Sequence, residues 1–229
     1  MAASPERLMP KSPSSQPPHP ERRARGRPRV ASAEQRRAEI VKAARRLFLA
    51  EGYGKTTMSE VAAHCRASKR TLYELFPSKT DLLAAVIEHH RTSMLALPGN
   101  YEGLDLCTAL EAIFQVDIDA DADAERAAFL SLTIVEAAQF PEVGEMMRRL
   151  GGQRAHALLA EWMEKERQAG RLFVDDTASA ARILMDMMFG AVVTKTGDGA
   201  EWPELEARKD YMRRCIRIFV HGTGKPAAP

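Results

Sequence analysis

The chain of 229 residues is 45% hydrophobic, enough to bury a core, but it has neither a 20-residue apolar run for a membrane span nor an apolar signal peptide. Cys65, Cys107 and Cys215 are scattered without any CxxC pair, which argues against a disulfide framework or a zinc site and indicates the reducing cytoplasm. The net charge of +2 divides into +10 over residues 1–79 and −8 over residues 80–229, which predicts a polyanion-binding module joined to a domain with another role.

Residues 1–31 are predicted to form a flexible basic tail. They contain seven prolines and no aromatic residue, so they cannot bury enough apolar surface to offset the cost of chain ordering. The segment Arg25-Gly26-Arg27-Pro28-Arg29 resembles the core of an AT-hook, whose arginines enter an A·T minor groove. Two interpretations stay open: Arg25 and Arg27 contact DNA beside the folded domain, or the segment is a solvated linker.

Three capping patterns mark helix starts between residues 32 and 97. The first begins at Ser32 and is followed by apolar residues at helical spacing up to Gly52, where the helix is expected to end. The second begins at Thr57 and starts a short helix, and the third begins at Ser78 and starts a longer one. These three segments predict a small helical module at the basic end of the chain.

Within this module, residues 57–76 have the pattern of two short helices joined by a three-residue turn. Ser68 is predicted to cap the second helix, which places Lys69, Arg70 and Thr71 on its first turn. First-turn residues of a recognition helix reach base edges in the major groove, where Arg and Lys donate to guanine and Thr contacts thymine. The pattern therefore predicts a helix-turn-helix that reads DNA.

Beyond residue 97 the pattern stays helical and shows no alternating strand signal. Helices are expected over Leu104–Ile118, Ala124–Phe140, Glu142–Ala169 with a break at Gly151-Gly152, Asp176–Lys195 and Pro203–His221. The fold class is therefore predicted to be all-α, with about nine helices.

The run from Glu39 to His90, above all TTMSEVAAHCRASKRTLYELFPSKTDLL, closely resembles the DNA-binding domain of the tetracycline-repressor (TetR) family of transcriptional regulators. The resemblance implies a homodimer whose recognition helices lie in major grooves, while the C-terminal helices supply a ligand pocket and a dimer interface. It also implies that Thr57, Tyr73 and Lys79 contact phosphates, which positions the recognition helix without reading sequence.

The turn departs from the family pattern at one position. The family usually has glycine there with a positive φ, whereas this chain has Arg66. A non-glycine residue in that conformation costs roughly 1 kcal/mol or more. We therefore expect either a strained Arg66 or a slightly different turn.

With this resemblance the chain is expected to have four parts. They are a disordered basic tail (1–31), a helix-turn-helix DNA-binding domain (32–79), a helical ligand-binding and dimerisation domain (80–222), and a flexible C-terminus (223–229).

The acidic part is rich in methionine and aromatic residues, which suit an adaptable binding surface, although core packing is the competing interpretation of each. The pocket candidates are Met94, Phe114, Phe129, Met147, Trp162, Met163, Met185 and Phe189. Apolar stripes on the last two helices are expected to pair with a two-fold copy as a four-helix bundle. The interface candidates are Ile183, Met187, Met188, Val192, Met212, Ile216 and Phe219.

Patterns that would indicate a metal or a catalyst are weak. Asp117, Asp119, Asp121 and Asp123 alternate as in a calcium loop, but the glycine and glutamate that such a loop needs are missing. Acidic residues at a helix N-terminus explain them better. Since there is no Ser-His-Asp order, paired-carboxylate signature or phosphate loop, no catalytic residue, metal or cofactor is predicted.

The sequence thus predicts a cytoplasmic homodimeric regulator, a repressor that a small apolar or amphipathic ligand releases from its operator in double-stranded DNA. No membrane partner is expected. Two alternatives from other classes remain: an architectural protein that prefers A·T-rich DNA and binds no ligand, and a helical enzyme that has kept the same fold.

Overall fold

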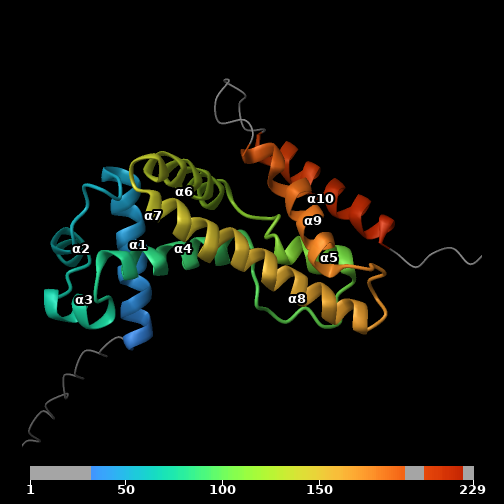
Figure 1. Ribbon diagram of the computed structural model, residues 1–229, viewed down its shortest axis with the longest axis horizontal. Helices are drawn as coiled ribbons and strands as arrows, with labels where there is room; N and C mark the ends of the chain where they lie inside the picture. The colour runs from blue at the N-terminus through green and yellow to red at the C-terminus, as the bar shows by residue number, and fades with distance from the viewer. Residues whose placement is uncertain (1–31, 194–203, 224–229) are drawn as a thin grey trace, which may run out of the picture.

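The computed structural model describes residues 32–193 and 204–223, with side chains of the first range described as far as Phe189. Every regular element in these ranges is a helix (Figure 1), which confirms the predicted fold class. None of these helices is long and apolar enough to cross a membrane. The elements are α1 (Ala33–Glu51), α2 (Met58–His64), α3 (Lys69–Leu75), α4 (Lys79–Met94), α5 (Leu106–Ile113), α6 (Ala120–Gln139), α7 (Pro141–Met146), η1 (Met147–Gln153), α8 (Arg154–Gln168), α9 (Thr177–Val193) and α10 (Leu205–Gly222).

The predicted break at Gly151-Gly152 is instead a π-helical segment, η1, that joins α7 to α8 without interruption. Single π-helical turns occur inside α-helices, so the two glycines loosen the helix there without ending it. Because α7, η1 and α8 form one continuous run, the described ranges contain nine helical runs, as expected.

Side-chain caps begin the helices of the N-terminal module where the sequence places them. The hydroxyl oxygen of Ser32 accepts from the backbone N–H of Gln35 at 3.1 Å, and that of Ser68 accepts from the N–H of Thr71 at 3.0 Å. Gly52 ends α1 with a φ of +86°, a conformation that glycine adopts without a Cβ clash. These local signals act within one turn of chain, which is why the sequence alone was enough to locate them.

Helix α5 ends earlier than predicted because Gln115 adopts a φ of +50°. The N–H of Val116 then donates to the carbonyl of Glu111 at 3.0 Å, which closes the helix with a Schellman cap. The side-chain amide of Gln115 donates to the carbonyls of Thr92 and Ser93 at the end of α4, at 2.8 and 2.9 Å. A tertiary contact therefore stabilises a helix end that no glycine marks.

Arg66 occupies the positive-φ position of the helix-turn-helix, with a φ of +51°. The N–H of Ala67 donates to the carbonyl of Ala62 at 2.9 Å, the bond that closes a Schellman cap after α2. The turn thus keeps the geometry that the family usually builds with glycine. The first of the two expectations for Arg66, strain rather than a changed turn, is the one the structure supports.

Two clusters of buried side chains form the cores. The N-terminal core joins α1–α4 to Phe129 of α6 and to Val143 and Met146 of α7. The C-terminal core joins α5, α8, α9 and α10 to the segment that follows α4. In Figure 1, α4 runs out of the helix-turn-helix end toward the middle of the molecule, and α8 continues from there toward α9 and α10. Helix α4 starts at the proposed boundary after residue 79, but Leu82 and Ile87 are fully buried in the N-terminal core.

We predict that Arg66→Gly raises the free energy of unfolding by about 0.5–1 kcal/mol, because glycine removes the left-handed strain while adding some freedom to the unfolded chain. Urea unfolding of both proteins measures this. Gln115→Gly is the matched control, because its positive φ is the same but its two side-chain hydrogen bonds are lost. Gln115→Gly should not raise the free energy of unfolding. An equal increase in both variants would contradict left-handed strain at Arg66 as the explanation.

Candidate DNA-binding surface

Helix α3 is held by its apolar side and presents its polar side to solvent. Leu72 and Phe76 are almost completely buried, at 0% and 1% exposed. Lys69 and Arg70, on the first turn, are exposed, and Tyr73 is 49% exposed on the same helix. The side chains predicted to meet DNA therefore project from a helix whose position is fixed by core packing.

The start of α3 is built from its own polar residues. The hydroxyl groups of Ser68 and Thr71 lie 2.8 Å apart and share a hydrogen bond. Thr71 is half-buried, so its hydroxyl stabilises the helix start before any DNA is present. The Thr71 hydroxyl must give up its hydrogen bond to Ser68 in order to contact a base. The longer side chains of Lys69 and Arg70 need no such exchange with Ser68.

Arg70 is oriented along the exposed face of α3 by a carboxylate one turn later. Its Nε donates to an oxygen of Glu74 at 2.8 Å, and both side chains are largely in solvent. An exposed pair of this kind is weak, so guanine can replace Glu74 as the acceptor at little cost. Glu74 also repels phosphates, which favours a base edge over the backbone as the destination of Arg70.

Lys79 and Thr57, two of the three expected phosphate contacts, both adjoin the loop between α1 and α2. The ammonium group of Lys79 donates to the carbonyl of Gly54 at 3.2 Å and lies 4.3 Å from the ring of Tyr53. Burial lowers the pKa of Lys79, while the nearby carboxylates of Glu136 and Glu60 act in the opposite direction. The ammonium still has N–H groups available for a phosphate.

The hydroxyl of Thr57 is already part of the capping box of α2. It accepts from the N–H of Glu60 at 3.3 Å and donates to the carboxylate of Glu60 at 2.9 Å. Thr57 is exposed at the N-terminus of α2, where the helix dipole favours an anion.

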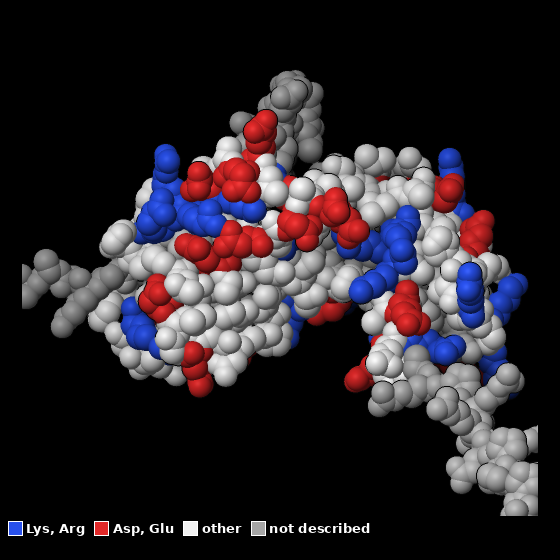
Figure 2. All heavy atoms as spheres, turned by 180° about the vertical axis from the view of Figure 1, so that it is seen from behind, with Lys and Arg blue, Asp and Glu red and all other residues white. Residues whose placement is uncertain are grey.

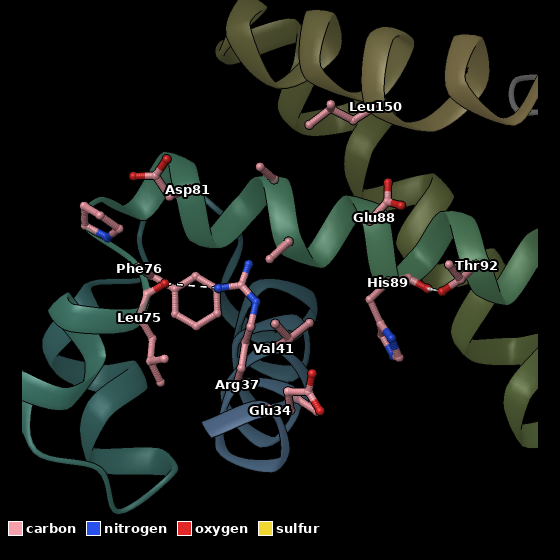
Figure 3. A pocket seen from close by; sticks show the side chains of 14 residues that line it. Glu34, Arg37, Val41, Leu75, Phe76, Asp81, Glu88, His89, Thr92 and Leu150 are labelled. Atoms are coloured by element: carbon pink, nitrogen blue, oxygen red, sulfur yellow. Dashed lines mark hydrogen bonds between the residues drawn. The ribbon is translucent and has the colours of Figure 1, made fainter. Parts of the chain in front are cut away.

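Arg37 is a positioning residue that the sequence did not reveal. From α1 it donates to the carbonyl of Leu75 at 3.1 Å, and its guanidinium lies 4.4 Å from the ring centre of Phe76 (Figure 3). A cation at the C-terminus of α3 satisfies an otherwise unpaired carbonyl and stabilises the helix dipole. Its partners lie about 38 positions along the chain, so only the tertiary structure brings them together. These side chains line an open groove of about 700 Å³ between α1, α4 and the end of α3.

Helix α6 holds the module from its other side. The N–H of Gly54 donates to a carboxylate oxygen of Glu136 at 3.2 Å, and the ring of Tyr53 meets that of Phe140 edge to face at 5.9 Å. Nearer the start of α6, Glu125 accepts from Arg45 of α1 at 2.7 Å. The loop before α2 is therefore fixed to a helix of the C-terminal part.

Charged side chains of both signs cover the surface of the molecule. In Figure 2 the helix-turn-helix end lies at the right, where Lys and Arg side chains are prominent along the outer edge with Asp and Glu between them; both signs also lie side by side at the opposite end. Arg25 and Arg27, the tail residues expected to contact DNA, lie outside the described residues. The folded module supplies a basic, exposed helix face of its own.

Two family models match the chain. Residues 40–86 match bacterial regulatory proteins of the tetR family, and residues 108–222 match the C-terminal domain of the AefR-like transcriptional repressors. The chain belongs to the TetR family. The helix-turn-helix described above, with α2 and α3, lies inside the first match.

Relatives and solved structures agree with this assignment. The HTH-type transcriptional regulator UidR of Escherichia coli K12 is 28% identical over 193 residues, which cover 83% of this chain and 93% of that protein. The structure of the flavonoid-responsive regulator FrrA matches with a TM-score of 0.56 and 26% identity, covering 85% of this chain and all of that one. GusR of Salmonella enterica matches with a TM-score of 0.58 at 23% identity, over 84% of this chain and 98% of that one, a likeness in fold.

This TetR-family chain is a transcriptional regulator, as are the relatives it matches, and not an enzyme. Among the described residues no group of His, Cys, Asp or Glu could hold a metal ion. Asp119 caps α6 and Asp121 and Asp123 lie in its first turn, which confirms their interpretation as acidic residues at a helix N-terminus.

No cavity described among residues 32–189 and 204–223 is lined by all eight pocket candidates. Phe114 and Met163 are fully buried in the C-terminal core, and Phe129 is fully buried in the N-terminal core. Trp162 is 7% exposed, and Met185 and Met147 pack against the edges of the C-terminal and N-terminal cores respectively. Met94 and Phe189 do line a common cavity, of about 40 Å³, between α4, α6, α9 and α10. Its other lining residues are Asp123, Arg126, Ala127, Leu130, Met188, Arg208 and Met212.

The dimer candidates also separate into two groups. Met188, Ile216 and Phe219 are buried in the chain's own core, so they offer almost no surface to a second copy. Met187 and Met212 are partly buried against that core, and the side chain of Val192 lies outside those described. Of the six candidates whose side chains are described, Ile183 is the one that is largely exposed, at 55%. Periodicity identified the apolar stripe of each helix but not which partner covers it.

We predict that Arg70→Ala lowers operator affinity by about 1–3 kcal/mol and relaxes base preference at one position, because it removes a base contact. Lys79→Ala should weaken binding to all sequences alike and reduce the salt slope of log K by about 1, because it removes a phosphate contact. Selection from a random duplex library followed by salt titration measures both effects. Identical base preferences in the two variants would show that the assignment is wrong.

Proposed function

We propose that this regulator binds a specific operator in double-stranded DNA as a homodimer and acts as a repressor that a small apolar or amphipathic ligand releases. The observation that carries the proposal is the exposed first turn of α3, with Lys69 and Arg70, inside a family match over residues 40–86. It acts in the cytoplasm, where its DNA is located. An architectural role based on the tail alone is not favoured, because a rigid recognition helix supplies direct base contacts.

A second copy is expected to cover the outer faces of α9 and α10. Ile183, Tyr211 and Ile218 are large apolar side chains that are 55%, 45% and 59% exposed on these two helices. Tyr211 also donates to the carbonyl of Met187 at 3.0 Å, which joins the two helices into one surface. A two-fold copy would place the recognition helices one turn of DNA apart, about 34–36 Å.

Release by a ligand requires an effector that prefers the conformation unable to bind DNA, with a coupling of roughly 1–3 kcal/mol. Both α4 and α6 reach from the N-terminal module to the cavity that contains Met94 and Arg126. The name of FrrA states that this relative responds to flavonoids, which supports a small-molecule effector for the present chain. Closure or opening of that cavity can therefore change the placement of the recognition helix.

We predict that Ile218→Glu converts the dimer into a monomer, because a charge at the centre of an apolar interface is left unpaired when buried. Sedimentation equilibrium at micromolar concentration measures the mass. Val135→Glu is the matched control, since Val135 is 60% exposed but belongs to α6 rather than to α9 or α10. A wild type that sediments as a monomer would falsify the proposed assembly.

Deletion of residues 1–29 should reduce DNA affinity and its salt dependence and remove any preference for A·T-rich flanks. The reason is that Arg25 and Arg27 carry charge that a narrow A·T minor groove attracts. The central base preference, which belongs to α3, should remain. Fluorescence anisotropy with duplexes that differ only in their flanks measures this, and equal affinities of the full and shortened chains on both would show that the tail is a linker.

A further inference from the structure

We infer that the effector of this regulator is an organic anion with an apolar body, and that Arg126 binds its charged group. The inference rests on the proposed ligand response and specifies its chemistry. It concerns the cavity between α4, α6, α9 and α10 and the arginine side chain of α6 that lines it.

The walls of this cavity are apolar and come from four helices. Met94 belongs to α4, Leu130 to α6, Phe189 to α9 and Met212 to α10. Three of the lining residues are methionines: Met94, Met188 and Met212. Their unbranched side chains can rearrange around ligands of different shape. An aromatic or aliphatic group therefore has suitable surroundings here.

The polar side of the cavity carries more positive than negative charge. Asp123 is engaged by Arg208 of α10, which leaves Arg126 near that carboxylate but without a hydrogen bond to it. The Nε atom of Arg126 is buried and has no hydrogen-bond partner among the described atoms. The nearby Arg45 differs in having an ion pair, with Glu125 at 2.7 Å, although its Nε also has no hydrogen-bond partner among the described atoms.

The surroundings of Arg126 confirm that its charge is incompletely compensated. Burial and the charges of Arg208 and Arg45 together lower the pKa of Arg126 to about 10, against the opposite effect of Asp123. His90, one turn before Met94 on α4, has its pKa lowered to about 3 by burial and by Arg45 and Arg126, so it adds no charge at neutral pH. Among the described residues, the three arginines Arg45, Arg126 and Arg208 thus lie near two carboxylates, those of Glu125 and Asp123.

A carboxylate is the group that completes this arrangement. It can accept two parallel hydrogen bonds from a guanidinium and supplies the missing negative charge in a site partly shielded from water. The oxygen of a neutral ligand could accept from the Nε of Arg126 but would supply no negative charge, and a cation would be repelled by the arginines.

The size of the cavity explains how binding would be coupled to DNA release. At about 40 Å³ it holds little more than a water molecule, so an effector must displace Met94, Met188 or Met212. Met94 lies at the end of α4, the helix that starts at Lys79 beside the recognition helix. Arg126 lies on α6, whose Glu136 binds the backbone of Gly54 before α2. A ligand that separates these helices shifts both supports of the DNA-binding module.

The test measures binding and DNA release separately with the full-length protein. Calorimetry measures the binding of three carboxylates, octanoate, 3-phenylpropanoate and 2-naphthylacetate, and of the primary amide of each. The proteins titrated are the wild type, Arg126→Met and Arg149→Met. Arg149 is an exposed arginine of η1 and serves as the matched control. Release of a labelled duplex selected by the protein is then followed by anisotropy. Arg126→Met should keep the melting temperature, because it replaces an incompletely paired charge with an apolar chain of similar length.

We expect at least one carboxylate to bind about 10- to 100-fold more tightly than its amide, and Arg126→Met to remove this difference while Arg149→Met retains it. The inference is wrong if no carboxylate is preferred over its amide, or if the preference survives in Arg126→Met. Anion binding that depends on Arg126 but does not release the duplex would support the site and contradict the proposed ligand release. Release of the duplex by the amides but not by the carboxylates would support the proposed ligand release and contradict the anion site.

Discussion

The arrangement of the whole molecule depends on the packing of α4 against both ends of the chain. Leu82 and Ile87 are completely buried among α1–α3, while Met94 at the other end of the helix lines the cavity that α6, α9 and α10 close. Since a helix is stiff over this length, a displacement at one end is transmitted to the other. The recognition helix follows directly before α4, so its position is set by the same contacts.

The DNA-binding surface illustrates how few contacts aim a recognition helix. Leu72 packs α3 into the core, Arg37 donates to the carbonyl of Leu75 at the C-terminal end of α3, and Ser68 caps the N-terminal end of α3. The exposed side chains themselves make only weak contacts, such as the pair of Arg70 and Glu74, so they can exchange them for base edges. A rigid scaffold with loosely held polar side chains suits sequence reading.

Arginines that are buried or half-buried distinguish the junction between the two parts from an ordinary apolar core. Arg45 and Arg208 form ion pairs with Glu125 and Asp123, whereas Arg126 has no ion pair among the described residues and its buried Nε has no acceptor. Burying an incompletely paired charge costs stability, so its retention in a cavity wall is most simply explained by a partner that binds there. The same helix, α6, also holds the loop before α2 through Glu136. The anion-binding side chain and the support of the DNA-binding module thus share one rigid element.

The sequence by itself determined the helical fold, the helix starts at Ser32, Thr57, Ser68 and Ser78, and the side chains that α3 exposes. These features depend on caps and periodicity that act within one or two turns of chain. The tertiary structure alone decided that Gln115 ends α5, that Arg37 holds α3, and which apolar residues of α9 and α10 face the chain's own core. It also placed Met94, Phe189 and Arg126 around one cavity, whereas Phe114 and Met163 are buried in the C-terminal core and Phe129 in the N-terminal core. Contacts between residues far apart in the chain produce these features, and the spacing of residues along one helix contains no information about the helix that will pack against it.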